Sequence, residues 1–380
     1  MKIAFLTPEY PHASMSASGG IGTSIKTLAK GIVGEGHSVR IMVYGQKEDR
    51  LFWDDGVLVH QIKNIKIKGF SWYFTQKKIE TIINQLHAKQ ELDLIEAPDW
   101  TGITSFINPR CPMVIRLHGS DTYFCYLDHR PVKWFNRFHE KRALQRATAH
   151  LSVSHYTAHL TNEIFKINKI FTVIPNSVDC MNFEKLTKIA SKPKKILYFG
   201  TLIRKKGVLE LPLIFNKVID ENPDVELYLV GRDTKDILSG TNSTWAMMKE
   251  LFTIKALNQV TYFGGVPYEE VKKYIQEASI CVFPTFAEAL PVSWLEAMAM
   301  EKALVSSDIG WATEIIEDGV SGFLVHPKAH QEFANKIITL INDDNLMAQM
   351  GQSARKRVSN LFNHQKVIHQ NLAFYQSLIQ

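Results

Sequence analysis

The sequence is poor in the residues that build disulfide frameworks and zinc sites. Its 380 residues include four cysteines, Cys111, Cys125, Cys180 and Cys281, which are widely scattered and form no C-x-x-C pair. Neither a disulfide scaffold nor a zinc site has this spacing. We therefore expect a cytoplasmic protein whose thiols are buried or inert.

Long apolar runs are also missing. No stretch reaches the roughly 18 apolar residues that cross a bilayer. The opening MKIAFLTPEY has the short apolar run of a strand and lacks the pattern of a signal peptide. These absences predict a protein that is soluble or that binds a membrane surface only. The length exceeds what one hydrophobic core usually supports, so two domains are expected.

The positive charge is unevenly distributed along the chain. The formal net charge is +6, and the excess of lysine and arginine lies in the first half, whereas the second half is close to neutral. A basic first half suggests an anionic surface or substrate, although a mildly basic soluble domain has the same composition. No nucleic-acid-binding motif accompanies these residues, so we expect no nucleic-acid partner.

Short apolar runs alternate with helical stretches, and this rhythm occurs twice. It begins with KIAFL and restarts at KILYFG after a polar, basic stretch at 176–194. Such alternation predicts an α/β fold with two doubly wound, Rossmann-like domains, at residues 1–180 and 190–362. Ligands of such folds bind at the carboxyl ends of the strands, so we expect a central cleft between the domains. The final helix, about residues 363–380, is expected to pack back on the first domain.

The most specific pattern lies in TFAEALPVSWLEAMAM, residues 285–300. Glu288 and Glu296 are separated by seven residues, between a strand-like CVFP and a helix. Together with GEGHSVRIMV, RLHGSD, IPNSVD and YFGTLIRKKG, this E-x7-E pattern resembles the retaining glycosyltransferases of the GT-B fold, family 4 type. The resemblance covers essentially the whole chain. It implies that the second domain binds a nucleotide-sugar donor, which we expect to be a UDP-sugar, and that the first binds the acceptor.

The resemblance assigns roles around the two glutamates. It implies that Glu288 holds the donor sugar and that Glu296 holds both ribose hydroxyls, because a carboxylate accepts hydrogen bonds from vicinal hydroxyls. The start of the intervening helix is a ready anion site for the diphosphate. Pro291 suits the first turn there, because its missing N–H costs little. The expected donor-binding stretch comprises Ala289, Leu290, Pro291, Val292 and Ser293, and the base is expected at Gly265 and Val266.

The stretch GTLIRKKG is expected to neutralise the leaving diphosphate. Lys206 matches the family lysine, whereas Thr201 stands where the family usually has arginine. Arg204 or Lys205 then becomes the candidate second cation, and either could instead be a solvated loop residue. Fixed cations and helix N-termini can stabilise developing negative charge. Because no D-x-D pattern occurs, we expect no metal and no other cofactor.

The first domain carries weaker signals. Gly20, in SASGGIGTSI, is expected to allow close approach of the donor phosphate or the acceptor, although an ordinary strand-to-helix turn also suits it. His118 ends the strand MVIRLHG, and the resemblance implies a place beside the reacting sugar; a hydrogen-bonded core histidine is the alternative. Asp121 could contact the acceptor. Glu314, in WATEII, is interpreted as structural.

Basic and aromatic residues are mixed in residues 130–146. Lys133, Arg137 and Lys141 recur every four residues, with Trp134 and Phe138 beside them. This spacing predicts a basic amphipathic helix that can rest on an anionic membrane. Such contact would suit a lipid-linked acceptor and a peripheral location at the inner face of the membrane. A helix packed on its domain with a solvated basic face is the alternative.

These patterns favour a retaining glycosyltransferase that extends a glycan or a lipid-linked sugar in polysaccharide or glycoconjugate biosynthesis. Two alternatives remain open. One is a GT-B-fold nucleotide-sugar epimerase, which the E-x7-E context disfavours. The other is a catalytically degenerate nucleotide-sugar-binding partner of a transferase, suggested only by Thr201.

Overall fold

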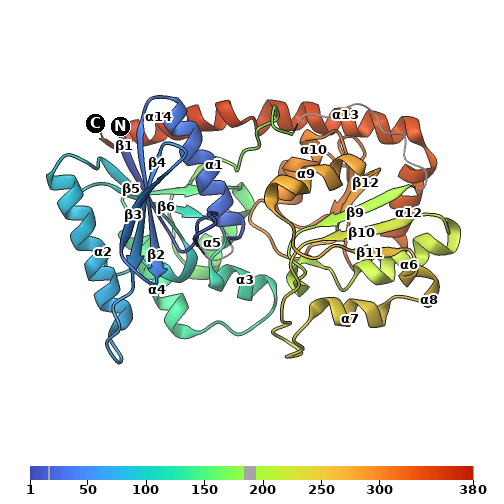
Figure 1. Cartoon of the computed structure of the whole chain (residues 1–380), viewed down its shortest axis with the longest axis horizontal. Coiled ribbons are helices and arrows are strands. Elements are labelled where there is room, and N and C mark those ends of the chain that lie inside the picture. Colours follow the sequence, from blue (N-terminus) through green and yellow to red (C-terminus); the bar gives the residue numbers. More distant parts are fainter. Residues whose placement is uncertain (16–17, 184–193, 380) are drawn as a thin grey trace. The chain divides into compact units, whose positions relative to one another are not determined.

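The computed structural model divides the chain into two compact units (Figure 1). Unit 1 comprises Met1–Ser177 and His364–Gln380, and unit 2 comprises Val178–Asn363. The structure describes residues 1–15, 18–183 and 194–379. Most of the polar stretch expected to link the domains, and residues 16–17 of the glycine-rich stretch, lie outside the described residues.

Unit 1 is built on an eight-stranded sheet of order β3-β4-β2-β1-β5-β6-β7-β8. All neighbouring strands are parallel except β3 and β4, which form an antiparallel hairpin. The sequence analysis does not include this hairpin. The strands are β1 (Lys2–Thr7), β2 (Ser38–Gln46), β3 (Arg50–Asp54), β4 (Val57–Lys63), β5 (Leu94–Pro98), β6 (Met113–Leu117), β7 (Ala149–Ser152) and β8 (Thr172–Val173).

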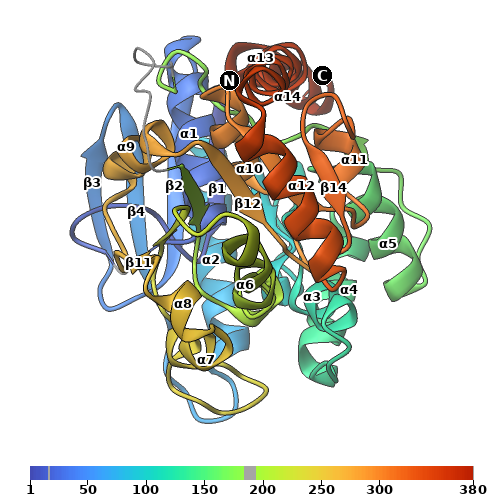
Figure 2. The ribbon, with the colours of Figure 1, turned by 90° about the vertical axis from the view of Figure 1, so that its right-hand side faces the viewer.

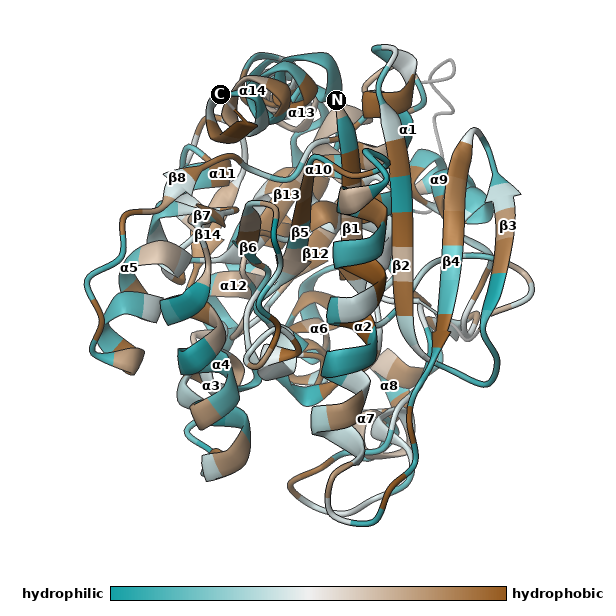
Figure 3. Cartoon of the chain, turned by 90° about the vertical axis from the view of Figure 1, so that its left-hand side faces the viewer, coloured by the Kyte–Doolittle hydropathy of each residue, from teal (hydrophilic) through white to brown (hydrophobic). Residues whose placement is uncertain are grey.

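Helices cover the sheet of unit 1, and the last helix of the chain is one of them. Figure 1 shows α14 beside α1, and its side chains Val367, Ile368 and Tyr375 share one core cluster with Ile3 and Ile32. Figure 3 shows brown, hydrophobic bands along the strands of this unit, and helices that carry both brown and teal bands. The helices are α1 (Gly20–Gly34), α2 (Ser71–Ala88), η1 (Trp100–Gly102), α3 (Asp121–Leu127), α4 (Trp134–Arg146), α5 (His155–Phe165) and α14 (His364–Ile379).

Unit 2 is built on a six-stranded parallel sheet of order β11-β10-β9-β12-β13-β14. Together with the first sheet it confirms the predicted pair of Rossmann-like α/β domains. The strands are β9 (Lys195–Phe199), β10 (Glu226–Val230), β11 (Val260–Tyr262), β12 (Ile280–Phe283), β13 (Ala303–Ser307) and β14 (Phe323–Val325).

The strands of unit 2 are connected by helices, among which α6 packs against α12 (Figure 2). The helices are η2 (Arg204–Lys206), α6 (Leu211–Glu221), α7 (Thr244–Leu251), α8 (Ile254–Leu257), α9 (Tyr268–Glu277), α10 (Val292–Ala299), α11 (Ala312–Ile315), α12 (His330–Asn342) and α13 (Asp344–Leu361). Of the helices described in either unit, none combines the length and the apolar character needed to cross a membrane.

Candidate active site

Two loops at the carboxyl edge of the second sheet are fixed against each other. One follows β9 and carries the KKG stretch; the other follows β12. The carbonyl of Lys205 accepts the N–H groups of Phe286 at 2.9 Å and Ala287 at 3.2 Å. Gly207 has a φ of +65°, and a Cβ there would lie 1.6 Å from the carbonyl oxygen of Pro284. Only glycine permits this approach, which brings the two loops into contact.

The contact between the loops pairs the predicted cation with the first glutamate. The Lys206 Nζ lies 3.0 Å from a Glu288 carboxylate oxygen, and the two side chains are 25% and 17% exposed. A partly exposed ion pair remains accessible to a ligand while each charge orients the other. The structure thus brings together two residues that are 82 positions apart in the sequence.

The second glutamate is buried and held by a tyrosine. Glu296, inside α10, is 4% exposed, and the hydroxyl of Tyr268 donates a hydrogen bond to its Oε1. Burial raises the pKa of the Glu296 carboxyl to about 7, against the opposing effects of this hydrogen bond and of the positive charge of Lys206. Lys206 therefore acts on both glutamates. The sequence analysis missed Tyr268, because nothing in its local pattern marks it.

The start of α10 lies between the two glutamates in the chain. Pro291 is its N-cap, one position before the helix, and no side chain caps the first turn. The first N–H groups of a helix have no partner within it and carry partial positive charge. Before the helix, Ala289 and Leu290 are nearly buried, whereas Val292 and Ser293 are partly exposed. Residues 289–293, the stretch predicted to bind the diphosphate, therefore include the first residues of a helix that no side chain caps.

Arg204 is directed to a different carboxylate. Its guanidinium makes two 2.8 Å hydrogen bonds to Asp236, which also accepts the N–H of Ser239. The hydrogen bond from Arg204 holds the pKa of Asp236 far below its usual range. This ion pair connects the loop after β9 to the loop after β10. To act as the predicted second cation, Arg204 must either leave Asp236 or contact the diphosphate while it remains paired. That role stays a prediction.

The predicted base-binding residues lie in the loop between β11 and α9. The N–H of Gly231 donates to the carbonyl of Gly264 at 2.8 Å, which joins this loop to the one after β10. Gly265 is exposed next to the backbone of Arg232, and Val266 is partly exposed. Gly265 and Val266 therefore lie two or three residues before Tyr268, at the same edge of the sheet as Lys206.

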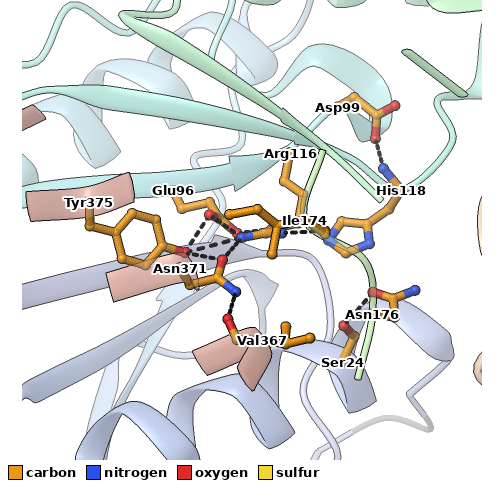
Figure 4. Close-up of polar contacts among 10 residues, drawn as sticks. All are labelled: Ser24, Glu96, Asp99, Arg116, His118, Ile174, Asn176, Val367, Asn371 and Tyr375. Carbon is orange, nitrogen blue, oxygen red and sulfur yellow. Dashed lines mark hydrogen bonds and ion pairs between the residues drawn. The ribbon is translucent and has the colours of Figure 1, made fainter. Parts of the chain in front are cut away.

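In unit 1, His118 lies at the wall of a small pocket that has both polar and apolar lining residues (Figure 4). The backbone N–H of His118 donates to the carboxylate of Asp99 at 2.9 Å. Ser24 and Asn176 also line the pocket, and the Ser24 hydroxyl donates to the Asn176 side-chain oxygen at 3.0 Å. Burial, followed by the charge of Arg116, lowers the pKa of His118 to about 3. His118 is thus a neutral imidazole at physiological pH, able to donate or accept a hydrogen bond.

Asp99 is a second residue that the sequence analysis missed. It follows β5, is 2% exposed, and its Oδ2 has no partner among the described residues. Burial raises the pKa of its carboxyl to about 7, and the charge of Glu140 adds to the effect. Its position directly after a predicted strand was the signal that could have found it.

The floor of this pocket is a buried polar network. Arg116, on β6, forms a bidentate ion pair with Glu96 on β5 at 2.7 and 3.0 Å. Asn371 and Tyr375 of α14 complete it: Arg116 bonds to both, and the Tyr375 hydroxyl lies 2.6 Å from Glu96 (Figure 4). All four side chains are at most 5% exposed. The network joins the last helix to the strand that leads into His118.

The other residues predicted in unit 1 have local partners or open surroundings. The N–H of Gly22, at the start of α1, donates to the carboxylate of Glu9 at 2.9 Å, whereas no atom lies within 4 Å of a Cβ built on Gly20. Asp121 accepts a hydrogen bond from Asn136 at 2.8 Å. A carboxylate therefore already lies at the start of α1, next to the position expected to approach a ligand.

Two further predictions, the structural role of Glu314 and the absence of a metal ion, concern residues outside the clusters described above. Glu314 is partly exposed on α11, and its carbonyl lies 3.4 Å from Arg357 of α13, a contact within unit 2. Within the described ranges, no cluster of three His, Cys, Asp or Glu side chains is arranged to hold a metal ion. The expected absence of a metal requirement stays a prediction.

Comparison with known proteins identifies the family. Residues 182–357 match the model described as glycosyl transferases group 1, and residues 18–181 match that of glycosyltransferase family 4. An uncharacterized glycosyltransferase of Methanocaldococcus jannaschii is 24% identical over 398 residues, covering 99% of this chain and 98% of the relative. The capsular polysaccharide biosynthesis glycosyltransferase CapM of Staphylococcus aureus is 25% identical over 296 residues, or 73% of each chain.

Solved structures share the fold over the whole chain. Sucrose-phosphate synthase from Thermosynechococcus elongatus aligns with a TM-score of 0.80 at 18% identity, covering 100% of this chain and 99% of that one. HepE of Anabaena in complex with UDP-glucose aligns with a TM-score of 0.74 at 22% identity, covering both chains fully. The chain belongs to the GT-B-fold glycosyltransferases of the family 4 type.

Proposed function

We propose that this glycosyltransferase moves a sugar from a UDP-sugar to a glycan or lipid-linked sugar acceptor, with retention of anomeric configuration and without a metal ion. The observation that carries the proposal is the 3.0 Å ion pair between Lys206 and Glu288, beside the uncapped start of α10. A cation, a carboxylate and the backbone amides of a helix start are groups that suit a sugar diphosphate.

Each of these residues has a proposed step in the reaction. Glu288 accepts hydrogen bonds from hydroxyls of the donor sugar, and Glu296 accepts those of the ribose. The ammonium of Lys206 and the first-turn amides of α10 stabilise the charge that develops on the β-phosphate as the sugar–oxygen bond breaks. The neutral imidazole of His118 hydrogen-bonds a sugar hydroxyl and so positions the sugar.

Relatives support the donor class. The solved structures of HepE carry UDP, UDP with glucose, and UDP-glucose. In this proposal a fixed cation, the ammonium of Lys206 paired with Glu288, neutralises the diphosphate charge in place of a metal ion. A sugar acceptor in polysaccharide biosynthesis is consistent with the likeness to the capsular polysaccharide glycosyltransferase.

Calorimetric titration of the purified chain with UDP, GDP and ADP, in the presence of EDTA, tests the donor site. We expect UDP to bind most tightly, with no loss of affinity on metal removal. Glu296→Gln should weaken UDP binding while leaving it measurable, whereas Glu314→Gln, a change at a glutamate assigned a structural role, should not weaken it. Failure of all three nucleotides to bind would contradict the proposal and favour a catalytically degenerate partner protein.

We also propose a peripheral membrane contact, but on a surface different from the single basic helix expected at residues 130–146. Arg137 turns inward: its guanidinium donates to the carbonyl of Ile164 at 2.5 Å and lies over the ring of Phe165. The helix α4 begins only at Trp134, so Lys133 is its N-cap. The evenly spaced basic face is therefore interrupted.

An exposed strip of aromatic side chains replaces that face. Adjacent rings lie 5.5–6.5 Å apart along a path from α2, through the loop after η1, to α4. The most exposed are Trp134 at 76% and Phe70 at 61%. Basic groups lie over it, including Arg142 at 4.6 Å from the Phe106 ring. The aromatic strip comprises Phe70, Tyr73, Phe74, Phe106, Trp134 and Phe138.

Exposed aromatic rings among cationic side chains suit the interface of an anionic bilayer. Co-sedimentation with phosphatidylglycerol vesicles, compared with phosphatidylcholine vesicles, tests the contact. The double variant Phe70→Ser, Trp134→Ser should lose most of the binding to anionic vesicles and keep its affinity for UDP. Ile170→Ser, at a 91% exposed apolar residue outside the strip, is the matched control. Equal sedimentation of all three proteins would contradict the membrane contact.

A further inference from the structure

The carboxylate of Glu296 accepts a hydrogen bond from one side-chain hydroxyl, whereas a ribose could donate two. Among the residues that the structure describes, its hydrogen-bond partner is Tyr268, which reaches Oε1 only. The second oxygen of this nearly buried carboxylate can therefore accept a further hydrogen bond. The vicinal hydroxyls of a ribose can each donate to one oxygen of the same group. The tyrosine is therefore a weaker partner than the ligand that this carboxylate is proposed to bind.

Tyr268 is placed so that it can give up this contact. It is the first residue of α9, directly after the loop that carries Gly264, which has a φ of +73°. The residue as a whole is 45% exposed, although its hydroxyl reaches a glutamate that is 4% exposed. Its ring meets Phe183 edge to face at 6.5 Å. Rotation about its side-chain bonds would move the hydroxyl into solvent without moving the sheet.

We propose that Tyr268 occupies the ribose position of Glu296 when no nucleotide is bound, and that the ribose hydroxyls displace it when a nucleoside diphosphate enters. This inference rests on the proposed function, in which Glu296 holds the ribose. Tyr268 then acts as a determinant of nucleotide affinity. It satisfies the buried carboxylate in the free protein, so every binding event must break the Tyr268–Glu296 hydrogen bond.

If the ribose displaces Tyr268, the direction in which Tyr268→Phe changes the UDP affinity can be predicted. Tyr268→Phe keeps the ring and removes the hydroxyl, so the free protein loses a hydrogen bond that the complex does not contain. UDP should therefore bind more tightly to Tyr268→Phe than to the wild type, by about tenfold for a hydrogen bond to a charged group. A tyrosine that touches the nucleotide would give weaker binding instead, and one that only supports the fold would give no change.

Calorimetry with two ligands makes the test specific. UDP reaches Glu296 through its ribose, whereas inorganic pyrophosphate can occupy the start of α10 without a ribose. We expect Tyr268→Phe to tighten UDP binding and to leave pyrophosphate binding unchanged. Weaker or equal UDP binding, or an equal gain for pyrophosphate, would overturn the inference. If the wild type binds no nucleotide, the proposed donor site itself fails; equal binding by both proteins counts against the role of Tyr268 alone.

Discussion

At the scale of the residue, the proposed reaction makes the charge of Lys206 most important when the leaving diphosphate forms. Lys206→Ala should lower kcat by at least about 100-fold, the loss typical when one preorganised electrostatic partner is removed from a transition state. The affinity for UDP should fall much less, because in the proposed complex the amides at the start of α10 would still face the phosphates. Steady-state kinetics and UDP titration check this, with Lys249→Ala as the control. Equal losses in kcat and UDP affinity would contradict it.

Glu296 should make nucleotide binding depend on pH. In the proposed complex, ribose hydroxyls donate to the ionised carboxylate, so binding would favour ionisation of a group whose pKa burial raises to about 7. UDP should therefore bind more weakly at pH 6 than at pH 8, and at pH 7 about half a proton should leave Glu296 per nucleotide. The hydroxyl of Tyr268, which faces this carboxylate, has a pKa that burial raises above its usual range, so it stays protonated over this interval.

Titrations in buffers of different ionisation enthalpy measure this proton release. Glu296→Gln is the matched control, because it removes the titrating group while the phosphates of UDP still titrate. The difference between the two proteins is the contribution of Glu296. Identical proton release by both would show that the carboxylate does not change its protonation on binding.

The residues that the sequence could nominate are those with a fixed local spacing. Glu288, Glu296 and Lys206 each lie in a recognisable stretch, and the structure brings all three to one edge of a sheet. Tyr268 and Asp236 could not be nominated, because their roles come from loops that meet only after folding. A side-chain hydrogen bond across such loops leaves no periodicity in the chain.

At the scale of the element, the alternation of apolar and helical stretches was enough to predict both parallel sheets. The hairpin of β3 and β4 was missed, although Asp55 and Gly56 join its strands with φ values of +49° and +79°. An Asp-Gly pair with positive φ at both positions is a strong hairpin signal. It was hidden because β3 is an edge strand with exposed Leu51 and Trp53, so its apolar residues do not alternate toward one buried face.

The element that depends most on distant partners is α14. Its Tyr375 donates to Glu96 and accepts from Arg116, and all three side chains are buried. Tyr375→Phe should therefore destabilise unit 1 by about 1–3 kcal/mol, the cost of leaving buried polar groups short of a partner. Arg116→Met should cost more, about 3–5 kcal/mol, because it leaves the Glu96 carboxylate buried without its counter-charge.

Urea denaturation followed by circular dichroism measures both changes. Ser377→Ala, on the exposed side of the same helix, is the control and should shift the free energy of unfolding by less than about 0.5 kcal/mol. A Tyr375→Phe protein as stable as the control would show that α14 is held by its apolar contacts alone.

At the scale of the whole molecule, the two units differ in how the chain forms them. Unit 2 is one continuous segment, Val178–Asn363, whereas unit 1 needs two segments that are separated by the whole of unit 2. The sequence analysis placed the final helix on the first domain because its apolar residues had to be buried somewhere. Sequence periodicity could not specify the partners Glu96 and Arg116, because they lie more than 250 positions away.

This asymmetry predicts opposite behaviour of two fragments. Residues 178–363 contain Lys206, Glu288 and Glu296 together with a complete sheet, so the fragment should fold alone and bind UDP as tightly as the full chain. Residues 1–177 lack Val367, Ile368 and Tyr375, whose loss opens the core beside α1, and should remain largely unfolded.

Circular dichroism and UDP titration of the two fragments test this. Joining residues 364–380 to residues 1–177 through a flexible linker should restore a cooperative unfolding transition, because α14 regains its place against Arg116 and the core of unit 1. A linked version carrying Tyr375→Ala and Ile368→Ala is the control and should not recover it. Cooperative folding of residues 1–177 alone would show that the last helix is an accessory to unit 1 and not part of its core.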